Sequence, residues 1–252
     1  MSGRLYVGTS GFAYQDWAPR FYPDGLRGDQ LLAYYASRFR ACELNNTFYA
    51  RPTAAKIDAW LRATPDEFRF AVKAQRGGSM RALLKDPDGS IPWLTETLPR
   101  FGERLGTVLF RAPKEVRLNL EHLTAFLERW PAEIPLTIEF QDLSWHVDEV
   151  FAALRDAGVA LCATDLPDDP EPPTLRVTGS FLYLRLRRHD YTRDEVESWA
   201  GRLAPFLRDE RDAFIFFRHD ETGRATELAD ALVLAIDDVL ATDASPVTAA
   251  RC

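Results

Sequence analysis

Short apolar runs alternate with amphipathic runs along most of the 252 residues. Apolar segments of this length, bounded by turn residues, are typical of strands in a buried sheet. The pattern predicts eight strands, at Leu5–Ser10, Ala41–Thr47, Arg69–Gln75, Thr107–Ala112, Leu136–Gln141, Ala160–Asp165, Phe181–Arg187 and Ala213–His219. Strands that alternate with helices form parallel sheets, so we expect one α/β domain, a TIM-type (β/α)8 barrel over residues 1–240.

Helical periodicity predicts the segments that connect these strands. Apolar residues recur at spacings of three and four in six stretches, Gln30–Phe39, Ala54–Ala63, Asn119–Trp130, Val147–Asp156, Arg193–Leu207 and Thr226–Leu240. Between the sixth and seventh strands, Pro167–Thr178 carries four prolines, which predicts a loop in place of the sixth barrel helix. Gly77-Gly78 indicates a flexible turn, and residues 241–252 a flexible tail.

The first connection is unusually long and aromatic. Gly11–Gly28 contains Phe12, Tyr14, Trp17, Phe21 and Tyr22. A loop of this length in a compact domain is usually a lid or a binding element. The alternative, a hydrophobic plug under the barrel rim, fits the composition equally well.

Strand parity predicts which side chains face the barrel interior. Alternate residues of a strand point to opposite faces. The inward set at the late ends of the strands contains eleven polar residues: Glu43, Asn45, Lys73, Gln75, Arg111, Glu139, Gln141, Asp165, Arg185, Arg187 and Arg218, the last replaced by His219 if the parity is reversed. Barrel enzymes build their sites at this end, so we expect a site at the C-terminal mouth.

The charge balance of this set suggests a ligand. Five cations face three carboxylates, although the chain as a whole has a formal net charge of -7. A basic hollow in an acidic protein would attract a small anion, such as a phosphorylated, carboxylated or nucleotide-like compound. Structural ion pairs are the alternative, with Glu43 bonded to Lys73, and Glu139 to Arg111 or Arg185.

The leading hypothesis is an enzyme, a hydrolase, lyase or isomerase, that uses carboxylate acid/base catalysis. Glu43 or Glu139 would move a proton and Lys73 would stabilise negative charge. The remaining residues would bind substrate: Arg185, Arg187 and Arg218 as an anion clamp, Asn45 as an orienting amide, Arg111, Gln141 and Asp165 in the lining, and Trp145 and Tyr14 as covers. A non-catalytic ligand-binding or scaffold protein is the alternative.

Other classes are less well supported. Gly8-Thr9-Ser10-Gly11 lacks nucleotide-binding spacing, so we expect no cofactor. The four histidines lack metal-binding spacing, and only His189-Asp190 and His219-Asp220 could converge with Asp165 or Glu139, so we expect no metal.

The expected surroundings follow from composition. The chain has no leader-like start and no apolar run long enough to cross a bilayer. The spacing of its three cysteines predicts no disulfide framework, which suggests reduced thiols. We therefore expect a cytoplasmic protein. The acidic net charge argues against nucleic acid as a partner; the alternative is that Arg187-Arg188-His189 with Tyr191 contacts a single strand. The sequence does not fix an oligomeric state.

Several segments together resemble a known family. They are Gly8-Thr9-Ser10-Gly11-Phe12-Ala13-Tyr14, Arg20-Phe21-Tyr22-Pro23, Glu43-Leu44-Asn45-Asn46-Thr47-Phe48-Tyr49, Phe68-Arg69-Phe70-Ala71-Val72-Lys73-Ala74 and Ile138-Glu139-Phe140. In this order they are similar to domain of unknown function family 72, also called YecE-like. The resemblance implies a TIM-type barrel and brings no established activity. The second half departs from the family pattern at Arg111–Lys114, Gln141-Asp142, Arg187-Arg188 and Arg218-His219, which implies a changed mouth.

Overall fold

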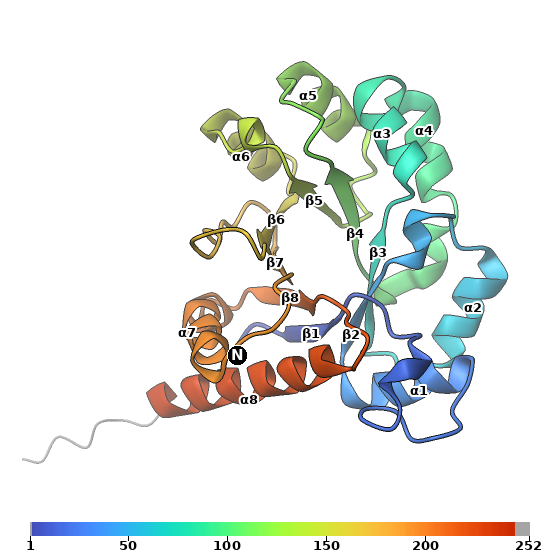
Figure 1. Cartoon of the computed structure of the whole chain (residues 1–252). Coiled ribbons are helices and arrows are strands. Elements are labelled where there is room, and N and C mark those ends of the chain that lie inside the picture. The colour runs from blue at the N-terminus through green and yellow to red at the C-terminus, as the bar shows by residue number, and fades with distance from the viewer. Residues whose placement is uncertain (1, 245–252) are drawn as a thin grey trace, which may run out of the picture.

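Eight parallel strands form the centre of the protein. The structure, a computed structural model, describes residues 2–244. The strands are β1 (Leu5–Thr9), β2 (Ala41–Leu44), β3 (Arg69–Lys73), β4 (Leu105–Ala112), β5 (Leu136–Phe140), β6 (Ala160–Asp165), β7 (Phe181–Leu186) and β8 (Asp212–Phe217). Their order in the sheet is β1-β8-β7-β6-β5-β4-β3-β2, and a single parallel bridge between Ser10 and Glu43 joins the two ends. The predicted barrel is confirmed as a nearly closed TIM-like sheet (Figure 1).

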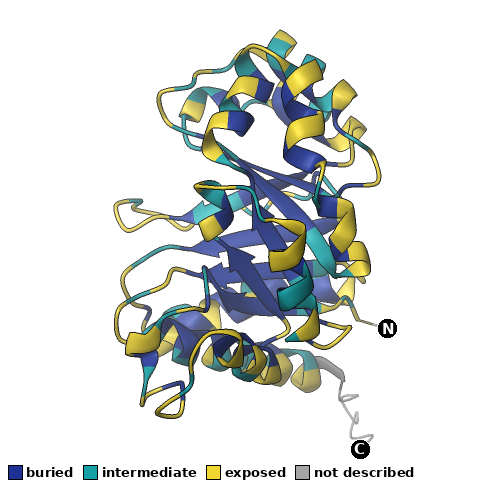
Figure 2. Ribbon diagram, turned by 90° about the vertical axis from the view of Figure 1, so that its right-hand side faces the viewer, coloured by how far each residue is buried: buried dark blue, intermediate teal, exposed yellow. Residues whose placement is uncertain are grey.

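The two faces of the sheet carry different residues, as parity predicted. Phe70, Val72 and Phe110 point outward and pack with the helices in the larger apolar cluster. Ala71 and Leu109 belong to a smaller cluster inside the barrel. The strands are therefore buried on both sides, and Figure 2 shows them as a dark central layer under helices whose outer faces are exposed.

Helices surround the sheet, and all six predicted helices are present. The α-helices are α1 (Asp29–Arg38), α2 (Ala54–Arg62), α3 (Arg76–Leu84), α4 (Pro87–Thr95), α5 (Leu120–Arg129), α6 (Asp148–Asp156), α7 (Arg193–Arg208) and α8 (Arg224–Ala244); the short 3-10 helices are η1 (Gln15–Trp17), η2 (Asn46–Phe48), η3 (Leu98–Arg104) and η4 (Leu143–Trp145). As predicted, no helix separates β6 from β7. Helix α8 includes residues 241–244 of the expected tail, and 245–252 lie outside the described residues.

The interpretation of Gly77-Gly78 as a flexible turn was wrong, because both glycines lie in α3. The Gln75 side chain caps this helix by accepting the Gly78 N–H at 2.7 Å. Gly78 is also a packing position, since an added Cβ would stand 2.6 Å from the ring of Trp93 in α4. The cap and this close contact outweigh the low helix propensity of glycine.

The aromatic loop after β1 is a plug. Trp17 and Tyr22 are buried, and Phe21 packs against Tyr35 and Phe39 of α1. The Trp17 indole N–H donates to the carbonyl of Asp220 at 2.7 Å, which ties the loop to the segment before α8. The structure therefore favours the plug over the lid.

Among the described residues, no helix is long and apolar enough to cross a membrane.

Candidate functional site

A buried ion cluster lies inside the barrel near its C-terminal end. Arg185 of β7 stands between two carboxylates, with Nη2 2.8 Å from Oε1 of Glu43 and Nη1 2.9 Å from Oε2 of Glu139. All three side chains are at most 3% exposed. Strands β2, β5 and β7 thus contribute their inward-facing charges to one cluster, as parity predicted.

Neutral side chains complete the hydrogen bonding of the carboxylates. Ser10 Oγ and Tyr183 Oη donate to Glu43, each at 2.8 Å, and Thr164 Oγ1 donates to Glu139 at 3.0 Å. Burial raises the pKa of Glu43, but the cations, Arg185 foremost, outweigh it and lower the pKa to about 2. Burial likewise raises the pKa of Glu139, but Arg185, Arg111 and Lys73 together outweigh burial and lower this pKa. Both carboxylates are therefore ionised at neutral pH.

Lys73 has a different environment. Its side chain is buried, and its Nζ lies over the ring of Phe48, 4.4 Å from the centroid. Within residues 2–244, its ammonium makes no ion pair or hydrogen bond, so the predicted Glu43–Lys73 pair is absent. Burial, followed by repulsion from Arg185, lowers the pKa of Lys73 to about 8.

The rim of the mouth is basic. Arg111 Nη2 donates to Gln141 Oε1 at 2.7 Å, and its Nε lies 3.6 Å from Glu139, so both alternative partners predicted for Glu139 are present. Arg187 donates to Ser10 Oγ at 3.2 Å. Arg218 is exposed, with Nη1 3.4 Å from Nδ1 of His189.

A cavity of about 480 Å³ opens at this rim. Its lining includes Phe48, Arg76, Arg111, Lys114 and Gln141. Three of these five side chains are cations, and Phe48 is the ring under the Lys73 ammonium. The cavity therefore places guanidinium and ammonium groups above the buried ion cluster, an arrangement suited to an oxyanion.

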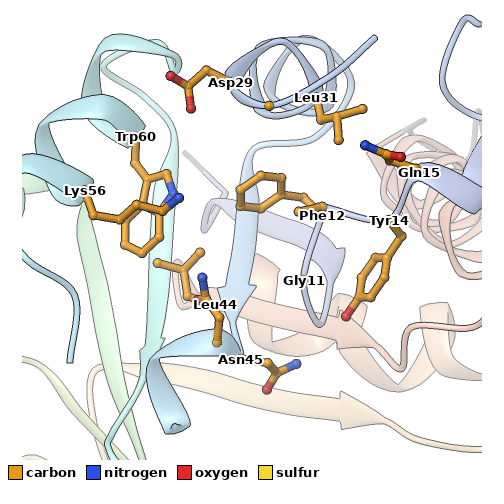
Figure 3. A pocket seen from close by; sticks show the side chains of 13 residues that line it. Gly11, Phe12, Tyr14, Gln15, Asp29, Leu31, Leu44, Asn45, Lys56 and Trp60 are labelled. Atoms are coloured by element: carbon orange, nitrogen blue, oxygen red, sulfur yellow. The ribbon is translucent and has the colours of Figure 1, made fainter. Parts of the chain in front are cut away.

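Asn45 and Tyr14 line another cavity, of about 430 Å³, between the aromatic loop, α1 and α2 (Figure 3). The Tyr14 ring stacks on His219 with centroids 4.8 Å apart, and its hydroxyl donates to the carbonyl of Ser10. Burial raises the pKa of Tyr14 to about 12. Both residues are thus near the mouth without lining the basic cavity.

Trp145 and Asp165 are turned away from the mouth, contrary to the predicted site. Trp145 is fully buried, stacks on Phe140 at 4.4 Å, and donates its indole N–H to the carbonyl of Val116 at 2.7 Å. In β6 the inward parity belongs to Cys162 and Thr164, so Asp165 points to the outside.

Asp165 accepts bonds from Arg188 Nε at 3.1 Å and from Tyr191 Oη at 2.9 Å. The Tyr191 ring is itself buried, so it cannot stack on a nucleic-acid base as hypothesised.

Two of the acidic residues considered as metal ligands have other roles: Asp190 pairs with Arg224, and Asp220 caps the start of α8. Within the described residues, no group of three or more histidines, cysteines and acids could hold a metal ion.

Three contributors to the site were missing from the prediction. Tyr183 shares the inward parity of Arg185, so parity alone could have found it. Ser10, at the end of the first predicted strand, was not assigned to the site, and the turn expected at Gly77-Gly78 hid the place of Arg76 at the start of α3.

Fold and site together define an α/β barrel protein with a buried carboxylate–guanidinium cluster beneath a basic mouth. The family model described as "Protein of unknown function DUF72" matches residues 6–249, and the chain belongs to this family. UPF0759 protein YunF of Bacillus subtilis (strain 168) is 25% identical over an alignment 268 positions long, which covers 88% of this chain and 91% of that protein.

Solved structures of the same family share the fold. A DUF72 family protein from Thermotoga maritima is 27% identical, with a TM-score of 0.77 over 94% of this chain and 99% of that chain. A DUF72 family protein from Enterococcus faecalis, 17% identical, has a TM-score of 0.78 over 92% and 95% of the two chains. The resemblance inferred from the motifs is confirmed.

Proposed function

We propose that the protein is an enzyme that binds a small anion at the C-terminal mouth and transfers a proton with Lys73. The observation that carries the proposal is the state of this lysine: it is buried and unpaired within residues 2–244, and its pKa is about 8. A group whose pKa lies near the ambient pH can both accept and release a proton, whereas a normal lysine is a poor base.

The carboxylates have a different role in this proposal from the one first expected. A Glu43 pKa of about 2 makes the carboxylate a weak base and leaves almost no acid form at neutral pH. Glu43, Glu139 and Arg185 instead form a fixed frame of charge around the amine. Arg111, Arg76 and Lys114 would hold the anion above it.

Binding of methyl phosphate, measured by calorimetry at pH 7, tests the anion site. Arg111→Met should weaken binding at least tenfold, because a guanidinium in the cavity lining is lost. The matched control is Arg38→Met at the end of α1, an exposed arginine at the opposite end of the barrel, which should leave binding unchanged. No binding by the native protein, or equal losses in both variants, would remove the anion site.

Catalysis needs a second measurement. A mouth ligand that co-purifies with the protein should be converted by fresh enzyme, and Lys73→Met should abolish the conversion. Glu139→Gln should also reduce turnover while the protein stays folded, because it disturbs the charge frame around Lys73. A ligand that is retained unchanged would favour the non-catalytic alternative.

A further inference from the structure

The wall of the barrel is open between β5 and β6. These strands share two register pairs, Thr137↔Ala160 and Ile138↔Leu161, whereas β4 and β5 share five. Beyond Ile138 the two strands separate, and Ala163 and Thr164 are only partly buried. The proline-rich segment, which joins β6 to β7 without a helix, lies on the outer side of this opening with Pro173, Thr174 and Arg176.

A cavity of about 410 Å³ fills this opening. Its inner lining includes Glu139 and Cys162, which face the barrel interior, and its outer lining includes Phe151 of α6 and Arg176 of the proline-rich segment. The Arg176 guanidinium lies over the Phe151 ring, 4.5 Å from the centroid. We refer to this cavity as the side slot. Its size and its mixture of apolar and few polar groups are typical of small-molecule sites.

The side slot adjoins the basic cavity. Gln141 and Leu166 line both spaces, and the Arg111 side chain holds Gln141 by a 2.7 Å hydrogen bond. The charges of the two spaces differ. The basic cavity has three cations and Glu115, whereas the side slot has the carboxylates of Glu139 and Asp169 and the stacked Arg176.

We propose that the side slot is a second subsite, which takes the uncharged ring of a ligand whose anionic group occupies the basic cavity. The inference rests on the proposed anion site and specifies its substrate class as small ring-bearing compounds with a single anionic group, such as aryl or heterocyclic phosphates. The basic cavity has three cations and the side slot one arginine, so the anionic end is attracted to the basic cavity and the ring is left for the slot. Phe151, Leu161 and Leu143 offer the ring an apolar surface.

Two phosphates that differ only by a ring test this assignment. The native protein should bind benzyl phosphate at least tenfold more tightly than methyl phosphate, measured by calorimetry. Thr174→Trp, at an exposed slot-lining position, should reduce benzyl phosphate affinity to that of methyl phosphate and leave methyl phosphate binding unchanged. Leu143→Trp, at another slot-lining position, which is 84% exposed, should act in the same way if the first variant folds poorly.

Glu171→Trp is the matched control, because Glu171 is exposed in the same segment but does not line the slot. It should keep the full preference for benzyl phosphate. Equal affinities of the two phosphates for the native protein, or a preference that survives both slot variants, would overturn the subsite and leave the anion site intact.

A neutral probe separates the two proposals if neither phosphate binds. Benzyl alcohol at millimolar concentration should shift the NMR resonances of Ala163 and Thr164 in the native protein but not in Thr174→Trp. That result would support the side slot although the anion site had failed. No shift in the native protein would refute the slot as well.

Discussion

Removal of the Arg185 charge should be the most damaging single change to the ion cluster. Arg185→Met keeps most of the side-chain volume but leaves Glu43 and Glu139 buried without the guanidinium that each bonds at 2.8–2.9 Å. The Glu43 pKa of about 2, against an ordinary 4.5, corresponds to about 3 kcal/mol at 1.36 kcal/mol per pKa unit. Breaking a buried ion pair typically costs 3–5 kcal/mol, so we expect a loss of about 4 kcal/mol at pH 7.

The pH dependence of this loss identifies its cause. In the native protein the folded pKa of Glu43 is depressed, so its stabilisation is present above pH 4.5 and is lost as the pH falls towards 2. In the variant the two buried carboxyl groups lose their strongest cationic neighbour, so they protonate at higher pH and their burial cost falls on acidification. The difference in unfolding free energy should therefore shrink by at least about 2 kcal/mol between pH 7 and pH 3.

Urea unfolding followed by tryptophan fluorescence measures this difference, since Trp17 and Trp145 are fully buried. Arg38→Met removes an exposed pair with Asp230 and should cost less than about 1 kcal/mol at either pH. A loss below about 1 kcal/mol for Arg185→Met, or a loss that is the same at pH 7 and pH 3, would refute the reasoning.

Three further changes test the surrounding residues. The native free energy of unfolding should rise by up to about 3 kcal/mol between pH 8 and 10.5, because in this range Lys73 keeps its proton in the unfolded state and has released it in the folded state. Urea unfolding of Lys73→Met should lack this rise. Parallel curves of unfolding free energy against pH for the native protein and the variant would contradict the prediction. Trp145→Phe should lower the free energy of unfolding by about 1–3 kcal/mol, because the hydrogen bond to the Val116 carbonyl is lost. Calorimetry should find an unchanged affinity for methyl phosphate, and a tenfold weaker affinity would place Trp145 in the site. Tyr183→Phe removes a donor to Glu43, so an NMR titration should show a higher Glu43 pKa, and an unchanged value would mean that this hydrogen bond is unimportant.

The alternation of residues within strands was sufficient to place most of the charged cluster. Glu43, Lys73, Glu139 and Arg185 occupy the inward parity of their strands, and the structure brings them together because parallel strands end at one edge. The inward prediction for Asp165 was wrong. Cys162 faces the barrel interior, so Asp165, three residues later at the end of β6, has the opposite parity and faces outward, where it bonds Arg188.

Tertiary structure alone decided how those charges pair. Sequence could not tell that Arg185, rather than Lys73, would lie between the carboxylates, because that depends on side-chain length and on the stagger of strands distant in the chain. The sequence also could not reveal that β5 and β6 pair at only two positions, Thr137↔Ala160 and Ile138↔Leu161, and separate beyond them.

Local sequence therefore determined the elements, the two faces of each strand and the end of the barrel at which charge collects. The electrostatic state of each group came only from the fold, because burial and neighbouring charges shift a pKa, and both arise when strands close into a barrel. The same residue types could have given an inert set of ion pairs. It is their three-dimensional arrangement that leaves Lys73 buried and unpaired within the described residues, with its pKa near neutrality.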